Sequence, residues 1–229
     1  MNFLLHRHFA LRERPRGGDD AAYLLGAMLP DLLRLVAPRR SRIRGAAVDA
    51  LRLHAASDVR ALGDGVAHHH DIDRWFHGCA VFEAGERALK DRFLETGTRR
   101  LLLFAHPGFE MCLDGAWLRR EAEDVGFDFA GARDLVLEAA RVTDLELDPT
   151  RVARVLAALD DGMLYDDYRS SRGIARRIAG MRLAFGFGAS TADDLERWSA
   201  ALEPSVESAH AALCELEASR TSSLDAARP

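Results

Sequence analysis

The sequence predicts an all-α protein, a single-domain helical bundle, and three observations lead to that prediction. Strong helix formers such as Ala, Leu, Arg and Glu dominate the chain. Apolar residues recur at three- and four-residue spacing, without sustained alternation of apolar and polar positions. A chain of 229 residues with 48% hydrophobic residues is long enough to bury one sizeable core. We therefore expect one domain over residues 1–218 and a disordered polar tail over residues 219–229.

Local signals place the helices of the first half of the chain. We expect Pro30 to kink the first helix, Asp64 to cap the third, and the Pro107-Gly108 pair to bend the fifth. The predicted segments are Tyr23–Val36, Ala46–Arg60, Asp64–His77, Val81–Leu94 and Thr98–Glu123.

The second half also carries start and stop signals for helices. The Asp148-Pro149 pair is typical of a helix start, and Ser190-Thr191 precedes a long last helix. Two stretches, Arg12–Asp20 and Arg39–Arg44, are expected to be mobile loops. The predicted helical segments are Ala130–Val142, Asp148–Leu159, Met163–Leu183 and 192–218.

Charge and hydropathy narrow the class of protein. The 31 Lys and Arg residues against 36 Asp and Glu give a net charge of −5, which argues against general binding to nucleic acid or to an anionic membrane. No apolar run approaches the ~20 residues of a membrane-spanning helix or forms a signal-peptide core, so we expect a cytoplasmic protein. The three cysteines are scattered, which indicates neither a disulfide framework nor a cysteine-based zinc site.

Histidine is concentrated in the first half, where eight of the nine lie before residue 107. Some of them fall at four-residue spacing with acids, so that two predicted helices each carry one stripe of possible metal ligands. Facing stripes of imidazole and carboxylate on neighbouring helices can hold Mn, Fe, Mg or Zn, although such spacing also occurs on solvated helix faces. The first stripe is His69, Asp73 and His77, and the second is His106, Glu110 and Asp114.

Three further residues leave the choice between structure and chemistry open. Asp31 follows an apolar run and Pro30, and is either an exposed acid or an inward ligand. His6 and His8 share a face if their segment is extended and lie too far around from each other if it is helical, so taken alone they are better explained as polar packing residues.

A basic segment follows the first predicted helix. Its guanidinium groups can hold a phosphate or an acidic partner, and a solvated loop is the alternative. The arginines concerned are Arg34, Arg39, Arg40, Arg42 and Arg44. The chain has no G-x-S-x-G nucleophile elbow and no phosphate-binding glycine loop, so activated water is the expected nucleophile of any hydrolysis.

An ordered set of these residues resembles the acyl carrier protein phosphodiesterase family. The set opens with Met-Asn-Phe-Leu and the histidines at 6 and 8, continues with Leu-Leu-Gly-Ala-Met-Leu-Pro-Asp ending at Asp31, and then has His69 through Ile72-Asp73. In the later half, Tyr168-Arg169, Ile174, Ile178 and Gly180-Met181 are similar in order and spacing.

The resemblance implies a fold related to the HD phosphohydrolases and removal of the 4'-phosphopantetheine arm from holo acyl carrier protein with a divalent metal, typically manganese. It places Asp31, His69 and Asp73 at metal-site positions, with His8 as a further position. The chain departs from the family where Phe76-His77 replaces Thr-Asp and where His106 and Glu110-Met111 replace an Asp and an Asp-His pair. These changes indicate a retained but altered metal site.

The resulting hypothesis is a metal-dependent phosphodiester hydrolase, with acyl carrier protein or a small phosphoester as its partner. A hydrolase of another phosphoester, such as a nucleotide, and a non-catalytic metal-binding helical domain are the alternatives. His69 and Asp73 would act in catalysis, Asp114 would orient the water or a ligand histidine, and the arginines at 34–44 would hold the substrate phosphate or the acidic carrier protein. The expected metal ligands are Asp31, His69, Asp73, His77, His106 and Glu110.

Overall fold

A computed structural model describes residues 3–14, 20–37, 42–121 and 131–226. Every regular element in these residues is a helix, which confirms the all-α prediction. The described chain divides into two compact units, where the sequence predicted one domain. The first unit contains residues 75–121 and 165–226, and the second contains residues 3–74 and 131–164.

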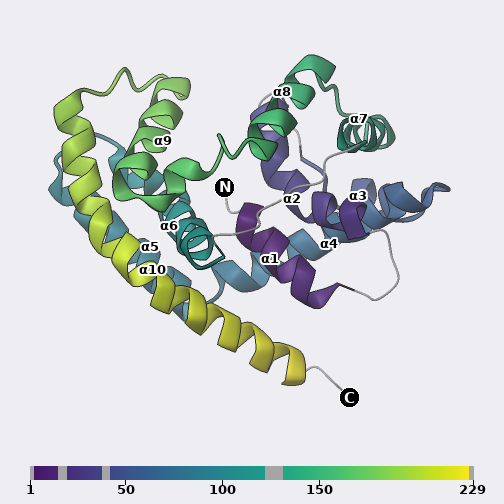
Figure 1. Ribbon diagram of the computed structural model, residues 1–229, viewed down its shortest axis with the longest axis horizontal. Helices are drawn as coiled ribbons and strands as arrows, with labels where there is room; N and C mark the ends of the chain where they lie inside the picture. The colour runs from purple at the N-terminus through teal and green to yellow at the C-terminus, as the bar shows by residue number, and fades with distance from the viewer. Residues whose placement is uncertain (1–2, 15–19, 38–41, 122–130, 227–229) are drawn as a thin grey trace. The chain divides into compact units, whose positions relative to one another are not determined.

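The second unit is built around α2. Helix α1 packs along α2, and α7 and α8 pack against α2 and against each other, while α3 contacts α7 (Figure 1). The elements of this unit are α1 (Phe3–Glu13), α2 (Asp20–Val36), α3 (Ala46–Arg52), most of α4 (Ser57–His77), α7 (Ala132–Val142) and α8 (Pro149–Asp160). The residues of α4 after Arg74 belong to the first unit. The predicted cap of α8 is confirmed, because the Asp148 carboxylate accepts a hydrogen bond from the backbone N–H of Thr150 at 2.9 Å.

Helices α2 and α4 approach each other so closely that only glycine fits at the contact. A Cβ added to Gly26 would overlap the carbonyl oxygen of Leu62, and a Cβ on Gly65 would overlap the carbonyl oxygen of Tyr23. Without side chains at these two positions, the two backbones come into direct contact. The crossing therefore sets the distance between residues on facing turns of α2 and α4.

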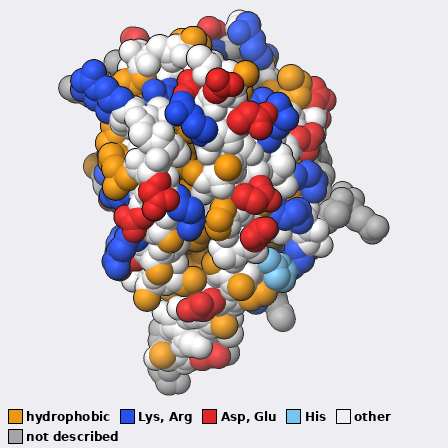
Figure 2. Space-filling view, turned by 90° about the vertical axis from the view of Figure 1, so that its left-hand side faces the viewer, with side chains coloured by type: hydrophobic (Ala, Val, Ile, Leu, Met, Phe, Trp, Pro, Cys, Tyr) orange, Lys and Arg blue, Asp and Glu red, His pale blue; other side chains and the backbone are white. Residues whose placement is uncertain are grey.

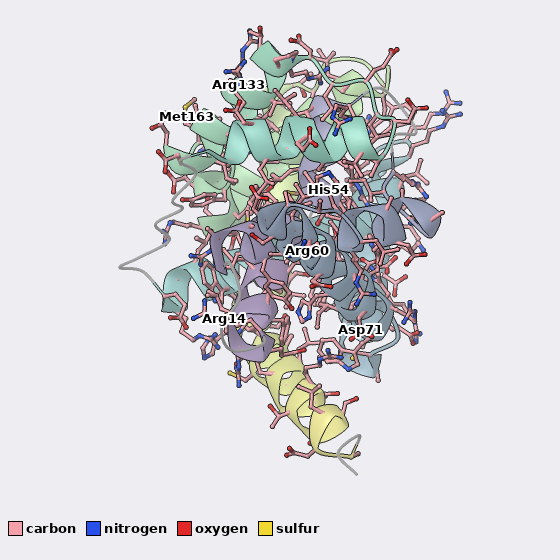
Figure 3. The ribbon with its side chains drawn as sticks, turned by 90° about the vertical axis from the view of Figure 1, so that its right-hand side faces the viewer. Arg14, His54, Arg60, Asp71, Arg133 and Met163 are labelled. Carbon is pink, nitrogen blue, oxygen red and sulfur yellow. The ribbon has the colours of Figure 1, made fainter. Side chains whose placement is uncertain are left out.

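The start of α4 differs from the prediction. The predicted helix Ala46–Arg60 breaks after Arg52, and the next helix begins at Ser57 instead of Asp64. Arg60 folds back and donates to the carbonyl oxygen of His54 at 2.8 Å, which closes the turn between the two helices (Figure 3). Asp64 is not a cap, since its carboxylate pairs with Arg52 at 2.7 Å.

The first unit packs on the long helix α10. Helices α5, α6 and α9 each contact α10, and α6 also contacts α5 and η2 (Figure 1). The elements are α5 (Ala80–Glu95), η1 (Leu101–Phe104), α6 (Ala105–Arg120), η2 (Asp166–Arg169), α9 (Ser171–Ala184) and α10 (Ala192–Ala226). Buried Trp198, Leu202 and Leu213 on α10 supply part of this core.

Three predicted elements of the first unit are wrong in their bounds. The segment predicted as a helix from Met163 is interrupted by η2, and α9 starts only after Ser170, whose hydroxyl accepts from the N–H of Gly173 at 3.1 Å. The predicted helix from Thr98 is divided into η1 and α6, so that Pro107 lies in the first turn of α6, where its missing N–H is tolerated. The predicted disordered tail is helical through Ala226.

The surface of the first unit mixes charges of both signs. On the face drawn in Figure 2, acidic and basic side chains lie beside one another. On this unit Arg172 pairs with Glu196 at 3.2 Å, and Arg177 pairs with Asp167 at 3.0 Å. Among the described residues, no helix combines the length and the apolar character that crossing a membrane requires.

Replacing Gly65 with Ala tests the close crossing of α2 and α4. We expect Gly65→Ala to lower the free energy of unfolding by ~1–3 kcal/mol, because the added methyl group must displace backbone. Gly180→Ala is the matched control: Gly180 is helical, nothing lies within 4 Å of an added Cβ, and the change should stabilise by ~0.5–1 kcal/mol. Urea unfolding of both variants measures the difference, and equal effects would contradict the close contact.

Candidate metal centres

Two groups of three side chains bring possible ligand atoms together, one group in each unit. Within each group the ligand atoms all lie within 4.8 Å of one another. We call His6, His69 and Asp73 the His6 group, and His77, His106 and Glu110 the His106 group. Each consists of two imidazoles and one carboxylate, a donor set that suits Zn, Fe or Mn.

The first predicted stripe is helical, but its members divide between the two groups. His69 and Asp73 belong to the His6 group in the second unit, and His77 belongs to the His106 group in the first unit. The sequence predicted one ion shared by both stripes. Each group is instead complete with residues of its own unit, so each is described separately.

In the His6 group, the backbone of α2 fixes the orientation of His69. Its Nδ1–H donates to the carbonyl oxygen of Ala27 at 2.8 Å, which leaves Nε2 with the lone pair that a metal needs. The ring of His6 stacks on the ring of His69, with 3.8 Å between the centroids. Both histidines are buried, and Asp73 is half-buried.

Burial keeps His69 in its metal-binding form. Desolvation lowers the pKa of His69, and the nearby Asp31 carboxylate and the Ala27 carbonyl oppose that shift. Asp31 is itself buried on α2, and its carboxylate lies 3.6 Å from the guanidinium of Arg34. Asp31 is thus an inward acid beside the His6 group, although it is not one of the three residues whose ligand atoms converge.

In the His106 group, two imidazoles converge on one carboxylate. Nε2 of His106 lies 3.3 Å from Oε1 of Glu110, and Nε2 of His77 lies 3.9 Å from the same oxygen. Glu110 is buried, while His77 and His106 are partly exposed. Solvent therefore reaches part of both imidazole side chains.

Helix α5 supports both imidazoles of the His106 group from one of its faces. The ring of Phe82 packs edge-on against His77 and against His106, with centroids 5.0 and 5.3 Å apart. One turn later, the Glu86 carboxylate accepts a hydrogen bond from Nδ1–H of His106 at 3.1 Å. A ligand histidine held at its second nitrogen by a carboxylate is a common arrangement in metal sites.

The charges around the His106 group shift the pKa of two members. Glu110 contributes most to raising the pKa of His106, burial opposes the rise, and Glu86 adds to it. Burial alone would raise the pKa of Glu110, but neighbouring positive groups, His106 among them, lower it well below its usual range. In the metal-free protein this group therefore attracts positive charge.

Other predicted site residues lie apart from the two groups or outside the described residues. Asp114 is fully buried on α6, one turn beyond Glu110, and its predicted role with water remains a prediction. Arg34, Arg42 and Arg44 are exposed in the second unit, whereas Arg39 and Arg40 fall outside the described residues.

Sequence reasoning missed His6 and Glu86. From the sequence alone, His6 was interpreted as a polar packing residue. The segment is helical, and His6 is buried against His69, whereas His8 packs beside Phe9. Glu86 lies in a charged helix whose spacing gives no sign of a partner twenty residues away. Asp71, the other acid near His69, is exposed and lies 3.7 Å from Arg74, so only Asp73 joins the group (Figure 3).

Comparison with known proteins adds no relative. No protein-family model matches the chain, and neither a curated protein nor a solved structure is significantly similar to it.

The pKa of His106 in the metal-free protein is directly testable. We expect its midpoint above the ordinary value of about 6.5, because the protonated ring pairs with Glu110 and Glu86. The corresponding stabilisation is complete below that ordinary value and is lost as the pH rises through the raised pKa. Histidine-ring NMR measures the midpoint, and Glu86→Gln should lower it. A midpoint at or below the ordinary value would contradict the arrangement.

Proposed function

We propose that the protein is a metal-dependent phosphoester hydrolase whose metal centre is the His6 group. The observation that carries the proposal is the convergence of His69 with His6 and Asp73, in which the Ala27 carbonyl holds Nδ1–H of His69 and leaves Nε2 as the ligand nitrogen. Two ligands that are each about 2.1 Å from an ion lie at most ~4.2 Å apart, so the 4.8 Å limit of the group needs only small side-chain movements. The residues present thus fit a divalent ion.

A divalent ion bound here would polarise a phosphoryl oxygen and lower the pKa of a bound water. His6, His69 and Asp73 would hold it, and burial keeps His69 neutral for that purpose. Asp31 is the buried carboxylate next to the group, so it is placed to accept the proton of the attacking water. The new P–O bond forms to the water oxygen and the ester P–O bond breaks; Asp31 then releases its proton to solvent, and the leaving alkoxide takes up one proton from solvent.

The positive charge beside Asp31 supports a phosphate-containing substrate. Arg34 lies on the same helix, is largely exposed, and has its guanidinium 3.6 Å from the Asp31 carboxylate. A guanidinium in this position can hold the non-reacting phosphate oxygens of a diester. The resemblance to acyl carrier protein phosphodiesterases makes the phosphopantetheine arm of holo acyl carrier protein the first substrate to test, within a fold of the HD-phosphohydrolase kind.

The experiment uses full-length protein without a histidine tag, loaded with Mn²⁺, and bis(4-nitrophenyl) phosphate as the probe. We expect metal-dependent hydrolysis that falls by ~10²-fold or more in His69→Ala, because the electrostatic stabilisation supplied by the ion is worth several kcal/mol. His54→Ala is the control, since this half-buried histidine of the same unit pairs with Glu138 and belongs to neither group. Release of the arm from holo acyl carrier protein, followed by mass, then tests the substrate.

Asp31→Asn separates metal binding from proton transfer. The variant keeps the shape of the side chain, so metal content should be retained while kcat falls by ~10²–10⁴-fold and its dependence on pH changes. Full activity in Asp31→Asn would remove the proposed base. Metal binding without hydrolysis of any phosphoester by the wild type would contradict the hydrolase and favour a non-catalytic metal-binding domain.

A further inference from the structure

We infer that the His106 group binds a divalent transition-metal ion of its own, separate from the ion proposed for the His6 group. The inference rests on the geometry of the first unit and does not depend on the proposed function. All three ligand residues lie within residues 75–121, and their ligand atoms lie within 4.8 Å of one another. The sequence interpretation had assigned these residues to one shared ion.

Both ring nitrogens of His106 face carboxylates, which requires a positive charge on or beside the ring. Its Nδ1 faces the Glu86 carboxylate at 3.1 Å, and its Nε2 faces the Glu110 carboxylate at 3.3 Å. Carboxylates only accept hydrogen bonds, and a neutral imidazole carries one N–H. Either a second proton or a metal ion must therefore occupy the Nε2 side, between the ring and Glu110.

The position of His77 favours the metal. A proton on His106 accounts for one nitrogen–oxygen pair, whereas a metal ion would also account for the approach of Nε2 of His77 to the same Oε1 of Glu110, at 3.9 Å. Two imidazole nitrogens and one buried carboxylate oxygen thus converge, which is the ligand set of a three-residue zinc or non-haem iron site.

The surrounding structure fixes the two imidazoles in advance. Phe82 is almost fully buried and packs against both rings, while Glu86 holds His106 from behind. The side chain of His106 is 42% exposed and that of His77 is 29% exposed, so solvent reaches part of both imidazoles. Imidazole donors favour Zn²⁺, Co²⁺ or Fe²⁺ over Ca²⁺ or Mg²⁺. Glu86 is a positioning residue in this site.

Titration of a variant that lacks the His6 group tests the inference. Tag-free, chelator-treated full-length His69→Ala is titrated with Co²⁺, and binding is measured by visible absorption and calorimetry. We expect one equivalent to bind, and none in His69→Ala/His106→Ala. His69→Ala/His210→Ala is the matched control, because it removes an exposed histidine of the same unit that belongs to neither group, and it should still bind one equivalent.

Two results would overturn the inference: absence of binding in His69→Ala, and retention of the equivalent in the double variant with His106→Ala. Failure of the proposed function gives a different result. The wild type then binds a single equivalent of Co²⁺, which is lost in His106→Ala and retained in His69→Ala. Circular dichroism checks the fold of each variant. If His106→Ala does not fold, His69→Ala/Glu110→Gln replaces it, since the amide keeps the shape of the side chain while removing the anionic ligand.

The role of Glu86 has its own readout. Glu86→Ala should weaken Co²⁺ binding by ~10–100-fold, the usual effect of losing an outer partner of a ligand histidine. Glu86→Gln should restore most of the affinity, because its amide oxygen can still accept from Nδ1–H of His106. Equal losses in both variants, or no loss in either, would contradict a positioning role.

Discussion

The contact between the backbones of α2 and α4 determines the geometry of the His6 group. Gly26 and Gly65 lack the side chains that would hold these helices apart, and the carbonyl of Ala27 therefore reaches Nδ1 of His69. This one hydrogen bond selects the tautomer of the ring and fixes its orientation beside His6. A side chain at the crossing would disturb both the packing of the unit and the orientation of its ligand.

In the first unit, close helix packing also fixes the orientation of the ligand histidines, but through different contacts. A Cβ on Gly85 would overlap the ring of Phe109, so a glycine again lets two helices, α5 and α6, approach closely. On either side of this glycine, Phe82 packs against the imidazoles and Glu86 bonds to His106. In both units, therefore, a close helix crossing places a hydrogen-bond acceptor behind a histidine. The two centres differ in exposure, since His6 and His69 are buried while His77 and His106 remain open to water.

Much of the secondary structure could be predicted from local signals, and the errors have a common cause. Asp148-Pro149 and Ser190-Thr191 precede helices as expected, because capping depends on neighbouring residues alone. Helix α4 was predicted to begin at Asp64 because aspartate often caps a helix. The helix begins at Ser57 instead and runs through Gly63 and Gly65, whose close packing against α3 and α2 compensates for their low helix propensity.

The sequence by itself determined the helical fold class and the two stripes of ligand-type residues, because periodicity of 3.6 residues is a local property of the chain. It could not decide which members of the stripes meet. Only the tertiary structure joins His69 and Asp73 to His6, and His77 to His106 and Glu110, because these partners lie 29 to 67 residues apart and meet through helix packing. Glu86 could not be predicted for the same reason, because its hydrogen bond with His106 forms only where α5 packs against α6.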